Sequence, residues 1–317
     1  MRYNKLIYAI LFLFLLSCGR NKTQETITIF HAGSLSYPMR KLVTAFNEEN
    51  PGIRVLTESS GSLAAARKIT DLNRICDIFA SADYKVIEEL LFPHHADWHI
   101  AFARNELAIV YSPESQYADE ITNENWHDIV LRPNVRYGRS DPHSDPCGYR
   151  TLLVWQLAEK YYNIPGLYNQ LLAKDARFIR PKSVDLLALL ETRTVDYLFL
   201  YKSVAKQHGL EFITLPDSIN LGNPYLREHY RTVSVTVRGT APGDSITFFG
   251  EPMLYALTIP HGAPNKPLAE KFISFVLDPE KGLQIMEESG QPPLIPCLAV
   301  GYDNISPKLQ QFVIPFY

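Results

Sequence analysis

The sequence predicts an α/β protein of two lobes that are joined by two crossings of the chain. Three observations lead to this fold class. Short apolar strands alternate with amphipathic helices from Thr26 onward, a turn-rich stretch at residues 112–125 interrupts the alternation, and an apolar strand at residues 253–259 follows the second alternating unit. Alternating strands and helices favour a parallel sheet with helices on both faces. Two such units with two crossings would leave a cleft between them, where ligands commonly bind.

The first lobe is predicted from three strands that are each followed by a helix. The strands are expected at residues 27–31, 53–57 and 76–80, and the helices at residues 35–49, 63–73 and 84–91. The first helix is followed by Asn50-Pro51-Gly52, a typical helix stop. The short, regular spacing of these elements favours parallel neighbouring strands.

The second lobe is predicted from a similar but less regular unit. Its strands are expected at residues 107–111, 135–138 and 197–201, and its helices at residues 148–162 and 183–191. The strand at 253–259 would then bring the chain back, and closing helices are expected at residues 267–277 and 280–289. We therefore assign residues 27–107 and 261–317 to lobe I and residues 108–260 to lobe II.

The chain begins with a predicted lipoprotein signal at residues 1–18. A basic start, an apolar run at residues 6–16 and a small residue before Cys18 are typical of a secretory signal. The run is shorter than the about 20 residues that a membrane-spanning helix needs. The ending Leu15-Leu16-Ser17-Cys18 resembles the lipobox of bacterial lipoproteins, which implies a lipid anchor on Cys18. The alternative is a plain secretory signal with a chance cysteine. Residues 19–26 would form a tether.

The composition is that of an ordinary globular protein, with 46% hydrophobic residues, 21% charged residues and a net charge of -3. This balance provides no basic surface for nucleic acid, so an anionic ligand would have to be held by local groups. Beyond Cys18 the cysteines are Cys76, Cys147 and Cys297. Their odd number and their spacing fit no metal template, and we expect no disulfide framework.

Three predicted strand ends carry small hydroxyl and glycine residues just before a helix. They are His31-Ala32-Gly33-Ser34, Ser59-Ser60-Gly61-Ser62 and the stretch from Asp141 to Arg150. A helix start has unpaired N–H groups and a partial positive charge, so it can bind an anion, and serine hydroxyls add donors. Each serine by itself is more often a simple helix cap. Their recurrence at strand ends in both units favours a ligand site in the cleft.

Several segments of the chain resemble the tungstate- and molybdate-binding receptors of ABC importers, and the WtpA-like branch of that family most closely. They are HAGSL at residues 31–35, the Gly61-Ser62 step, SDPCGYR at residues 144–150, DYLFLYKSVAKQHG at residues 196–209 and GQPPLIP at residues 290–296. The resemblance covers nearly all of residues 27–296. It implies a type II periplasmic-binding-protein fold that holds molybdate or tungstate in the cleft.

The resemblance also implies which residues contact the oxyanion. Lobe I would contribute Gly33, Ser34 and Ser62, and lobe II would contribute Asp145, Pro146, Cys147, Ser183 and Tyr201. Pro146 has no N–H, so its contact would be packing or an effect on loop shape. No cofactor is implied beyond the ligand. The expected partners are an ABC permease and its ATPase, and the receptor itself is expected to be an anchored, extracytoplasmic monomer.

Asp145 is implied to be a direct ligand of the tungsten or molybdenum centre. A carboxylate beside an anion is unfavourable unless the central atom can accept additional oxygen ligands. Tungsten and molybdenum can do so, whereas sulfur in sulfate cannot, so the same carboxylate would discriminate against sulfate. The alternative is that Asp145 only caps the helix before Pro146.

At Ser183 the chain departs from the family branch, which has a glutamate at the matching position. Either Asp185 takes over that role, or Ser183 donates a hydrogen bond to an oxo group of the ligand. Residues two apart on a helix point about 200° apart, so the second alternative is our hypothesis.

Three other functions compete with the receptor interpretation. His94, His95 and His99 form no recognised metal template and are expected in a surface loop. A serine hydrolase would need Ser34 beside His31, but the chain has no Gly-x-Ser-x-Gly elbow. A receptor of the same fold for sulfate, phosphate or an organic anion remains open, although phosphate and organic-acid sites more usually include an arginine clamp. Arg150 is the nearby candidate for such a clamp.

Overall fold

The computed structural model describes residues 25–174, 177–239 and 243–316. The predicted signal, the lipobox Cys18 and most of the tether lie outside the described residues. Within these ranges, no helix combines the length and the apolar character needed to cross a membrane.

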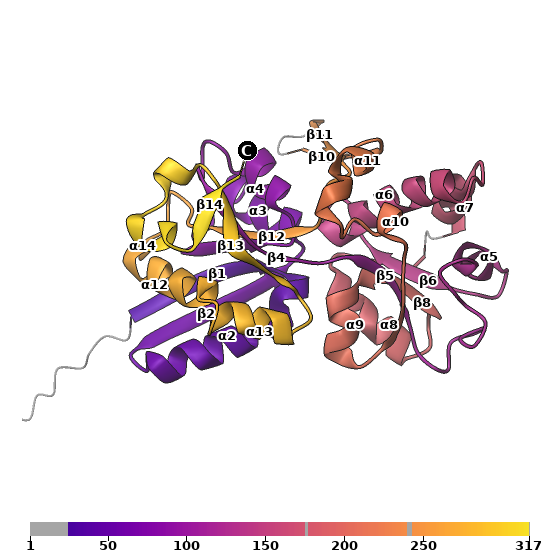
Figure 1. Cartoon of the computed structure of the whole chain (residues 1–317), viewed down its shortest axis with the longest axis horizontal. Helices are drawn as coiled ribbons and strands as arrows, with labels where there is room; N and C mark the ends of the chain where they lie inside the picture. The colour runs from indigo at the N-terminus through magenta and orange to yellow at the C-terminus, as the bar shows by residue number, and fades with distance from the viewer. Residues whose placement is uncertain (1–24, 175–176, 240–242, 317) are drawn as a thin grey trace, which may run out of the picture.

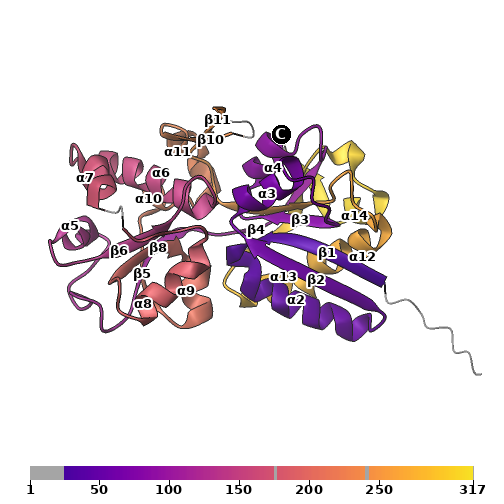
Figure 2. The same cartoon turned by 180° about the vertical axis from the view of Figure 1, so that it is seen from behind.

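Lobe I is built on a sheet with the strand order β14-β13-β4-β12-β3-β1-β2. Its strands are β1 (Glu25–Ala32), β2 (Ile53–Ser60), β3 (Ile78–Ser81), β4 (His99–Arg104), β12 (Leu254–Thr258), β13 (Pro293–Val300) and β14 (Val313–Pro315). The helices α3 (Ser62–Thr70) and α4 (Tyr84–Leu90) pack on one face of this sheet. The helices α2 (Ser36–Glu49), α12 (Lys266–Leu277) and α13 (Gly282–Glu288) pack on the other face, and α14 (Pro307–Gln310) adjoins α12 (Figures 1 and 2).

The register of the sheet brings the predicted glycine–serine strand ends together. β1 runs parallel to β2 and to β3, with Ala32 opposite Ser60 and His31 opposite Ala80. The carboxyl ends of the three strands therefore share one edge, where the 3-10 turn η1 (Gly33–Leu35), α3 and α4 begin. The expectation of parallel strands is confirmed for this part of the sheet, whereas β12 and β4 run antiparallel to their neighbours.

Lobe II is built on a smaller sheet with the strand order β7-β6-β8-β5-β9. Its strands are β5 (Leu107–Tyr111), β6 (Tyr137–Ser140), β7 (Ile179–Arg180), β8 (Tyr197–Tyr201) and β9 (Glu211–Thr214). Its helices are α5 (Trp126–Leu131), α6 (Pro146–Tyr161), α7 (Leu167–Lys174), α8 (Leu187–Glu191), α9 (Lys202–His208), α10 (Asp217–Asn220) and α11 (Arg227–Tyr230). The 3-10 turns η2 (Ser183–Leu186) and η3 (Pro224–Leu226) and a hairpin of β10 (Ser234–Arg238) and β11 (Ser245–Phe249) complete it.

The chain crosses between the lobes twice, from β4 to β5 and from β11 to β12 (Figure 1). The return crossing corrects the expected boundary. Residues 254–258 were assigned to lobe II, but β12 lies between β3 and β4 in the sheet of lobe I. β12 is buried along its whole length, as is usual for a central strand. Because its apolar sequence is compatible with a central place in either sheet, the sequence alone does not show which sheet it joins.

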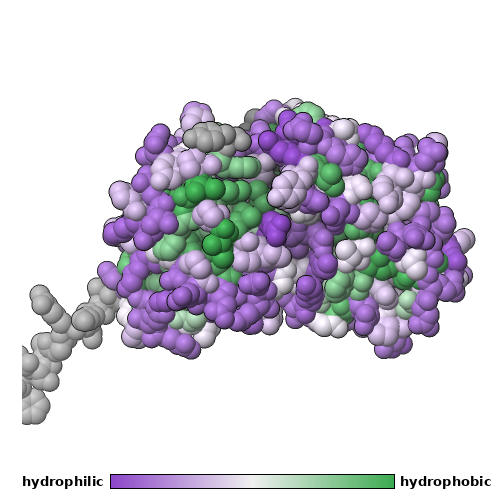
Figure 3. Space-filling view, in the orientation of Figure 1, coloured by the Kyte–Doolittle hydropathy of each residue, from purple (hydrophilic) through white to green (hydrophobic). Residues whose placement is uncertain are grey.

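The surface is mostly hydrophilic, and hydrophilic side chains also line the junction of the two lobes in Figure 3. On the left-hand lobe of that view hydrophobic residues gather over the C-terminal strands, where Ile295 and Ile314 are exposed. The core beneath is continuous through both sheets and includes Trp126 and Trp155 in lobe II and Phe30 and Phe46 in lobe I.

Candidate functional site

The candidate site lies where η1 and α3 of lobe I meet α6 and η2 of lobe II. The two lobes touch here, since Ala64 N donates a hydrogen bond to the Ser144 carbonyl oxygen at 3.1 Å. Gly61 faces the same carbonyl so closely that a Cβ atom on it would overlap the Ser144 oxygen and lie 2.9 Å from Asp145 Cβ. The lobes are thus closed over the predicted site residues, and a glycine is needed at residue 61 for that approach.

Two hydroxyls of lobe I are held so that their protons are left to donate. Ser62 Oγ accepts a hydrogen bond from Ala82 N at 3.0 Å, and Ser34 Oγ accepts one from the Tyr255 hydroxyl at 3.1 Å. Both serines are buried. A hydroxyl carries one proton and two lone pairs, so a lone pair occupied by a protein donor leaves the proton for another acceptor. An oxyanion oxygen is an acceptor of the required kind.

Tyr201 shows the same arrangement in lobe II. Its hydroxyl accepts a hydrogen bond from Arg150 Nη1 at 3.0 Å and is buried at the end of β8. Burial raises the pKa of Tyr201 well above its ordinary value, although Arg150 opposes the shift, so the phenol keeps its proton. This side chain can therefore also act as a hydrogen-bond donor into the site.

Two further buried serine hydroxyls make no hydrogen bond of good geometry among the described residues, although both lie close enough to the Asp145 carboxylate to lower its pKa. They belong to Ser183, at the start of η2, and to Ser140, at the end of β6. Buried polar atoms are rarely left without a partner, because each such atom costs about 1–3 kcal/mol. Ser183 was predicted as a site residue, whereas Ser140 was not, because it lies between the strand predicted at 135–138 and the stretch that begins at Asp141.

The carboxylate of Asp145 is buried and holds two backbone donors. Its Oδ2 accepts from Ser183 N at 2.7 Å and its Oδ1 accepts from Cys147 N at 3.3 Å. Burial raises the pKa of Asp145 to about 6, against these hydrogen bonds, which lower it. Asp145 thus caps α6, and the nearby hydroxyls of Ser140 and Ser183 also lower its pKa.

The remaining predicted contacts are less direct. Pro146 occupies the first turn of α6, where its lack of an N–H costs nothing. The N–H of Cys147 is already used by Asp145, and its Sγ lies 3.7 Å from the Phe199 carbonyl oxygen. Gly33 faces lobe II, where a Cβ atom on it would meet Val184 at 3.4 Å.

The structure separates the two alternatives for η2. Ser183 is buried, whereas Asp185 is exposed and pairs with Lys182 at 3.5 Å. A carboxylate that points to the surface cannot replace one in the cleft, so Asp185 is not part of the site. The hypothesis that Ser183 faces the ligand is consistent with this arrangement.

A buried charge pair that sequence reasoning missed crosses the cleft beside these hydroxyls. Arg150 Nη2 of α6 lies 2.9 Å from Asp83 Oδ2 at the end of β3, and Arg150 Nη1 donates to the Ala82 carbonyl oxygen at 2.7 Å. The Tyr149 hydroxyl donates to the same Asp83 oxygen at 2.6 Å. Arg150 was considered only as an anion clamp, but its charge is neutralised by Asp83. Nothing in the sequence links two residues so far apart.

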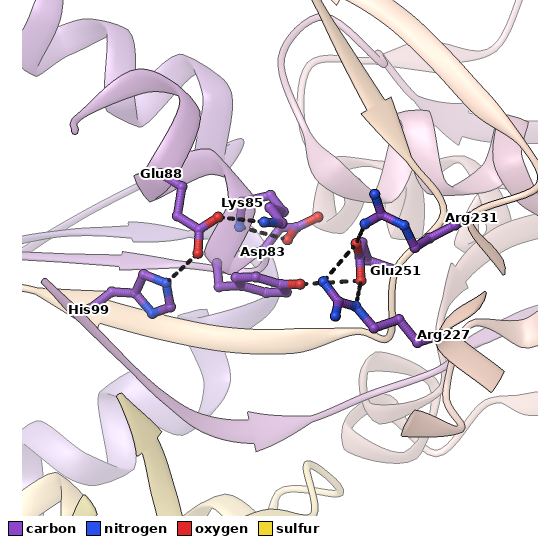
Figure 4. Close-up of polar contacts among 8 residues, drawn as sticks. Asp83, Lys85, Glu88, His99, Arg227, Arg231 and Glu251 are labelled. Carbon is purple, nitrogen blue, oxygen red and sulfur yellow. Dashed lines mark hydrogen bonds and ion pairs between the residues drawn. The ribbon is translucent and has the colours of Figure 1, made fainter. Parts of the chain in front are cut away.

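Figure 4 shows a second polar cluster next to Asp83, at the return crossing. Glu251 precedes β12 and binds Arg227 Nε at 2.8 Å, binds Arg231, and accepts from the Tyr84 hydroxyl at 3.3 Å. Arg227 and Arg231 come from lobe II and Tyr84 from lobe I, so this carboxylate joins both lobes to the crossing.

The structure shows the surroundings of two of the histidines considered above, His99 and His31. His99 was expected in a surface loop, but it opens β4, is fully buried and lies 3.0 Å from Glu88 Oε1 through its Nε2 (Figure 4). No group of three or more potential metal ligands occurs among the described residues. His31 Nδ1 is 2.8 Å from the Ala32 carbonyl oxygen, and Ser34 Oγ is bonded to Tyr255, which is not the pairing that a serine hydrolase requires.

Comparisons with known proteins show which family and which relatives the chain is similar to. Residues 27–290 match the protein family described as bacterial extracellular solute-binding protein. The chain is 49% identical over 288 residues to a solute-binding protein of Petrotoga mobilis, covering 90% of this chain and 89% of that one. It is 40% identical over 337 residues to the molybdate/tungstate-binding protein WtpA of Pyrococcus abyssi, covering 96% of each.

Solved structures share the fold at low sequence identity. The periplasmic molybdate-binding protein of Azotobacter vinelandii has a TM-score of 0.60 at 17% identity and covers 84% of this chain and 98% of that one. The sulfate-binding protein SubI of Mycobacterium tuberculosis has a TM-score of 0.62 at 15% identity and covers 92% of each. At such identities the likeness supports the two-lobed fold of periplasmic binding proteins and no particular ligand.

Proposed function

The chain belongs to the bacterial extracellular solute-binding proteins, and on this premise we propose that it captures molybdate or tungstate and delivers the oxyanion to an ABC permease. The observation that carries the proposal is the set of buried hydroxyls at the lobe junction. Ser34, Ser62 and Tyr201 each accept a hydrogen bond from the protein and keep a proton to donate. Such neutral donors from both lobes suit a small oxyanion that is enclosed on closure.

Asp145 supports the choice of molybdate or tungstate over sulfate. A buried carboxylate in contact with an anion whose central atom accepts no further ligand, such as sulfate, adds repulsion in a region of low dielectric constant. The same carboxylate can donate a lone pair to a molybdenum or tungsten centre that expands its coordination. The relatives named as molybdate/tungstate-binding proteins agree with this choice. A sulfate or phosphate receptor is the alternative, since the chain has Ser183 where the family branch has a second carboxylate.

The test is isothermal titration of the chain from residue 19 onward with tungstate, molybdate, sulfate and phosphate. We expect tight binding of the first two and no heat from the other two. Asp145→Asn should then weaken molybdate binding and let sulfate bind, because the neutral amide neither coordinates the metal nor repels sulfate. Heat from sulfate or phosphate with the wild-type protein, or no heat from any anion, would contradict the proposed ligand and leave the fold unaffected.

We further propose that the protein is tethered to the outer face of the cytoplasmic membrane through Cys18 and works as a monomer with a permease and its ATPase. The support is the signal and lipobox pattern at residues 1–18. Expression of Cys18→Ala in a bacterial host should move the protein from the membrane fraction to the soluble fraction. Unchanged fractionation would contradict the anchor. No catalytic activity is proposed, because the Ser34 hydroxyl has no histidine partner among the residues described.

A further inference from the structure

Arg150 lies between the two lobes. It contacts Tyr201, a proposed hydrogen-bond donor to the oxyanion, in lobe II, and it also contacts residues of lobe I. From α6 it donates to the Tyr201 hydroxyl at 3.0 Å within lobe II. It also donates to the Ala82 carbonyl oxygen at 2.7 Å and pairs with Asp83 at 2.9 Å, both in lobe I. Its side chain is 2% exposed and that of Asp83 is 5% exposed, so the contacts are closed to solvent.

We propose that Arg150 is a positioning residue that couples closure of the lobes to the direction in which the Tyr201 hydroxyl donates its proton. This inference rests on the proposed function, because it assigns a role within the same oxyanion site.

The first step of the argument is the hydrogen bond to Tyr201. A guanidinium group has no acceptor, so Arg150 can only donate to the phenol oxygen and must occupy one of its lone pairs. The hydroxyl proton of Tyr201 therefore cannot point toward Arg150. Among the described residues the Tyr201 hydroxyl has no hydrogen-bond acceptor, so its proton is left for a ligand. Arg150 thus determines that Tyr201 acts as a donor toward the oxyanion.

The second step is the dependence of Arg150 on lobe I. Two of its three partners, Ala82 and Asp83, belong to the lobe that moves away when the cleft opens. Tyr149 also donates to Asp83, at 2.6 Å, and so would lose its acceptor on opening. The guanidinium is therefore held in place beside Tyr201 only when the lobes are closed.

The third step connects Arg150 to the hydroxyl of the other lobe. Ala82 accepts from Arg150 through its carbonyl oxygen and donates through its N–H to Ser62 Oγ. One residue of lobe I therefore contacts the groups that orient both Ser62 and Tyr201. The buried pair of Arg150 and Asp83 need not add net stability, since desolvation offsets much of its attraction. Its contribution is the alignment of the donors.

A double-mutant cycle tests the positioning role. Lysine at residue 150 keeps the charge for Asp83 but lacks the planar fork that reaches several acceptors at once. We expect Arg150→Lys and Tyr201→Phe each to weaken molybdate binding by about tenfold to a hundredfold, as the loss of a hydrogen bond to a charged group does. The double variant should bind no more weakly than the weaker single variant, because both changes remove the same donor.

The inference would be overturned if the double variant lost affinity by the product of the two single losses, or if Arg150→Lys bound molybdate as tightly as the wild type. The proposed function would stand in either case. A wild-type protein that binds no oxyanion would overturn both.

The closure role has a readout that needs no ligand. Asp83 also caps α4 by accepting from Lys85 N, and asparagine caps helices equally well, so Asp83→Asn removes the charge without removing the cap. The buried Arg150 would then be unbalanced in the closed form. We expect X-ray scattering to show a larger radius of gyration for Asp83→Asn than for the wild type. The charge-matched control is Asp303→Asn, at an exposed residue of the 3-10 turn η4 (Tyr302–Asn304) in lobe I. An unchanged radius of gyration would overturn the coupling to closure.

Discussion

At the scale of single residues, Asp145 combines a structural and a chemical role in one buried carboxylate. It caps α6 through Cys147 N and ties η2 to that cap through Ser183 N. Both bonds stabilise the ionised form, yet burial outweighs them and raises the pKa of Asp145 to about 6. Burial therefore disfavours the ionised carboxylate. A contact with the electron-poor molybdenum or tungsten atom of the proposed ligand would favour it again.

The raised pKa of Asp145 predicts a pH dependence of stability. The folded state binds this proton more tightly than the unfolded chain, where the pKa is near 3.8, so stability is lost as the pH rises from about 4 through about 6. A difference of about two pKa units corresponds to roughly 3 kcal/mol. The unfolding free energy of the wild type minus that of Asp145→Asn should fall by up to that amount between pH 4 and pH 7. Urea denaturation without ligand measures it, and parallel pH profiles of the two proteins would contradict the shift.

Ser183 allows a test of the orphan hydroxyls. Its Oγ makes no hydrogen bond of good geometry among the described residues, and its interaction with the Asp145 carboxylate only partly offsets the burial of that group. If the hydroxyl donates to the oxyanion, Ser183→Ala should lower molybdate affinity about tenfold, with a smaller effect on the melting temperature than on binding. Ser306→Ala, which removes another unpartnered buried hydroxyl near the C-terminus, is the matched control for titration. Equal affinity of the Ser183 variant and the wild type would place the hydroxyl outside the ligand contacts.

At the scale of elements, the site depends on how closely the start of α3 approaches the loop before α6. Ala64 N donates to the Ser144 carbonyl oxygen, and Arg67 of the same helix donates to the His143 carbonyl oxygen at 2.5 Å. Successive donors of α3 thus hold the loop that carries Asp145. This contact is possible because residue 61 has no side chain.

Gly61→Ala is predicted to block closure without disturbing lobe I. The backbone at residue 61 has φ -62° and ψ 144°, which alanine adopts without strain, so the lobe should fold normally. The added methyl group would overlap the Ser144 carbonyl oxygen only when the lobes are closed. A packing conflict of about 1–3 kcal/mol predicts molybdate binding weaker by about tenfold to a hundredfold, measured by titration.

Gly52→Ala is the control for that experiment, because a Cβ atom at Gly52 meets nothing within 4 Å. It should bind molybdate as the wild type does. Wild-type binding by the Gly61 variant would show that the lobes need not approach this closely when the ligand is held.

At the scale of the whole molecule, two lobes with separate sheets are joined by the crossings and by polar contacts at the junction. Glu251 is the central group of the return crossing, since it is 5% exposed and meets side chains of both lobes (Figure 4). The guanidinium of Arg227 has its pKa raised, first by the hydrogen bond to Glu251. This cluster holds the lobes in register beside the Asp83 pair.

Glu251→Gln is predicted to lower the unfolding free energy by about 1–2 kcal/mol, a modest amount because both arginines remain partly hydrated. Denaturation by urea measures the change. Glu280→Gln, which alters an exposed carboxylate in lobe I away from the junction, is the control and should have no effect. A Glu251 variant as stable as the wild type would mean that the cluster aligns the lobes without stabilising them.

Much of the fold and part of the site could be predicted from the sequence. The first strand–helix units were predicted because the strand and helix periods are local, and the glycine–serine ends of β1 and β2 do meet at one sheet edge. The cap of α6 was also predicted, since Asp145-Pro146 is a local helix-start pattern. The hairpin of β10 and β11 was not expected, although β10 alternates polar residues with Val235 and Val237. The strands β13 and β14 were not expected either, and they take their form from pairing with each other and with β4.

By itself the sequence determined the α/β class, the two-lobed arrangement and the hydroxyl-bearing strand ends, because each follows from residues that are neighbours along the chain. Only the tertiary structure decided which sheet receives β12, that Asp185 turns outward while Ser183 is buried, and that Asp83 meets Arg150 across the cleft. These features depend on contacts between segments far apart in sequence. Such contacts are selected by the packing of the whole molecule, and no local pattern records them.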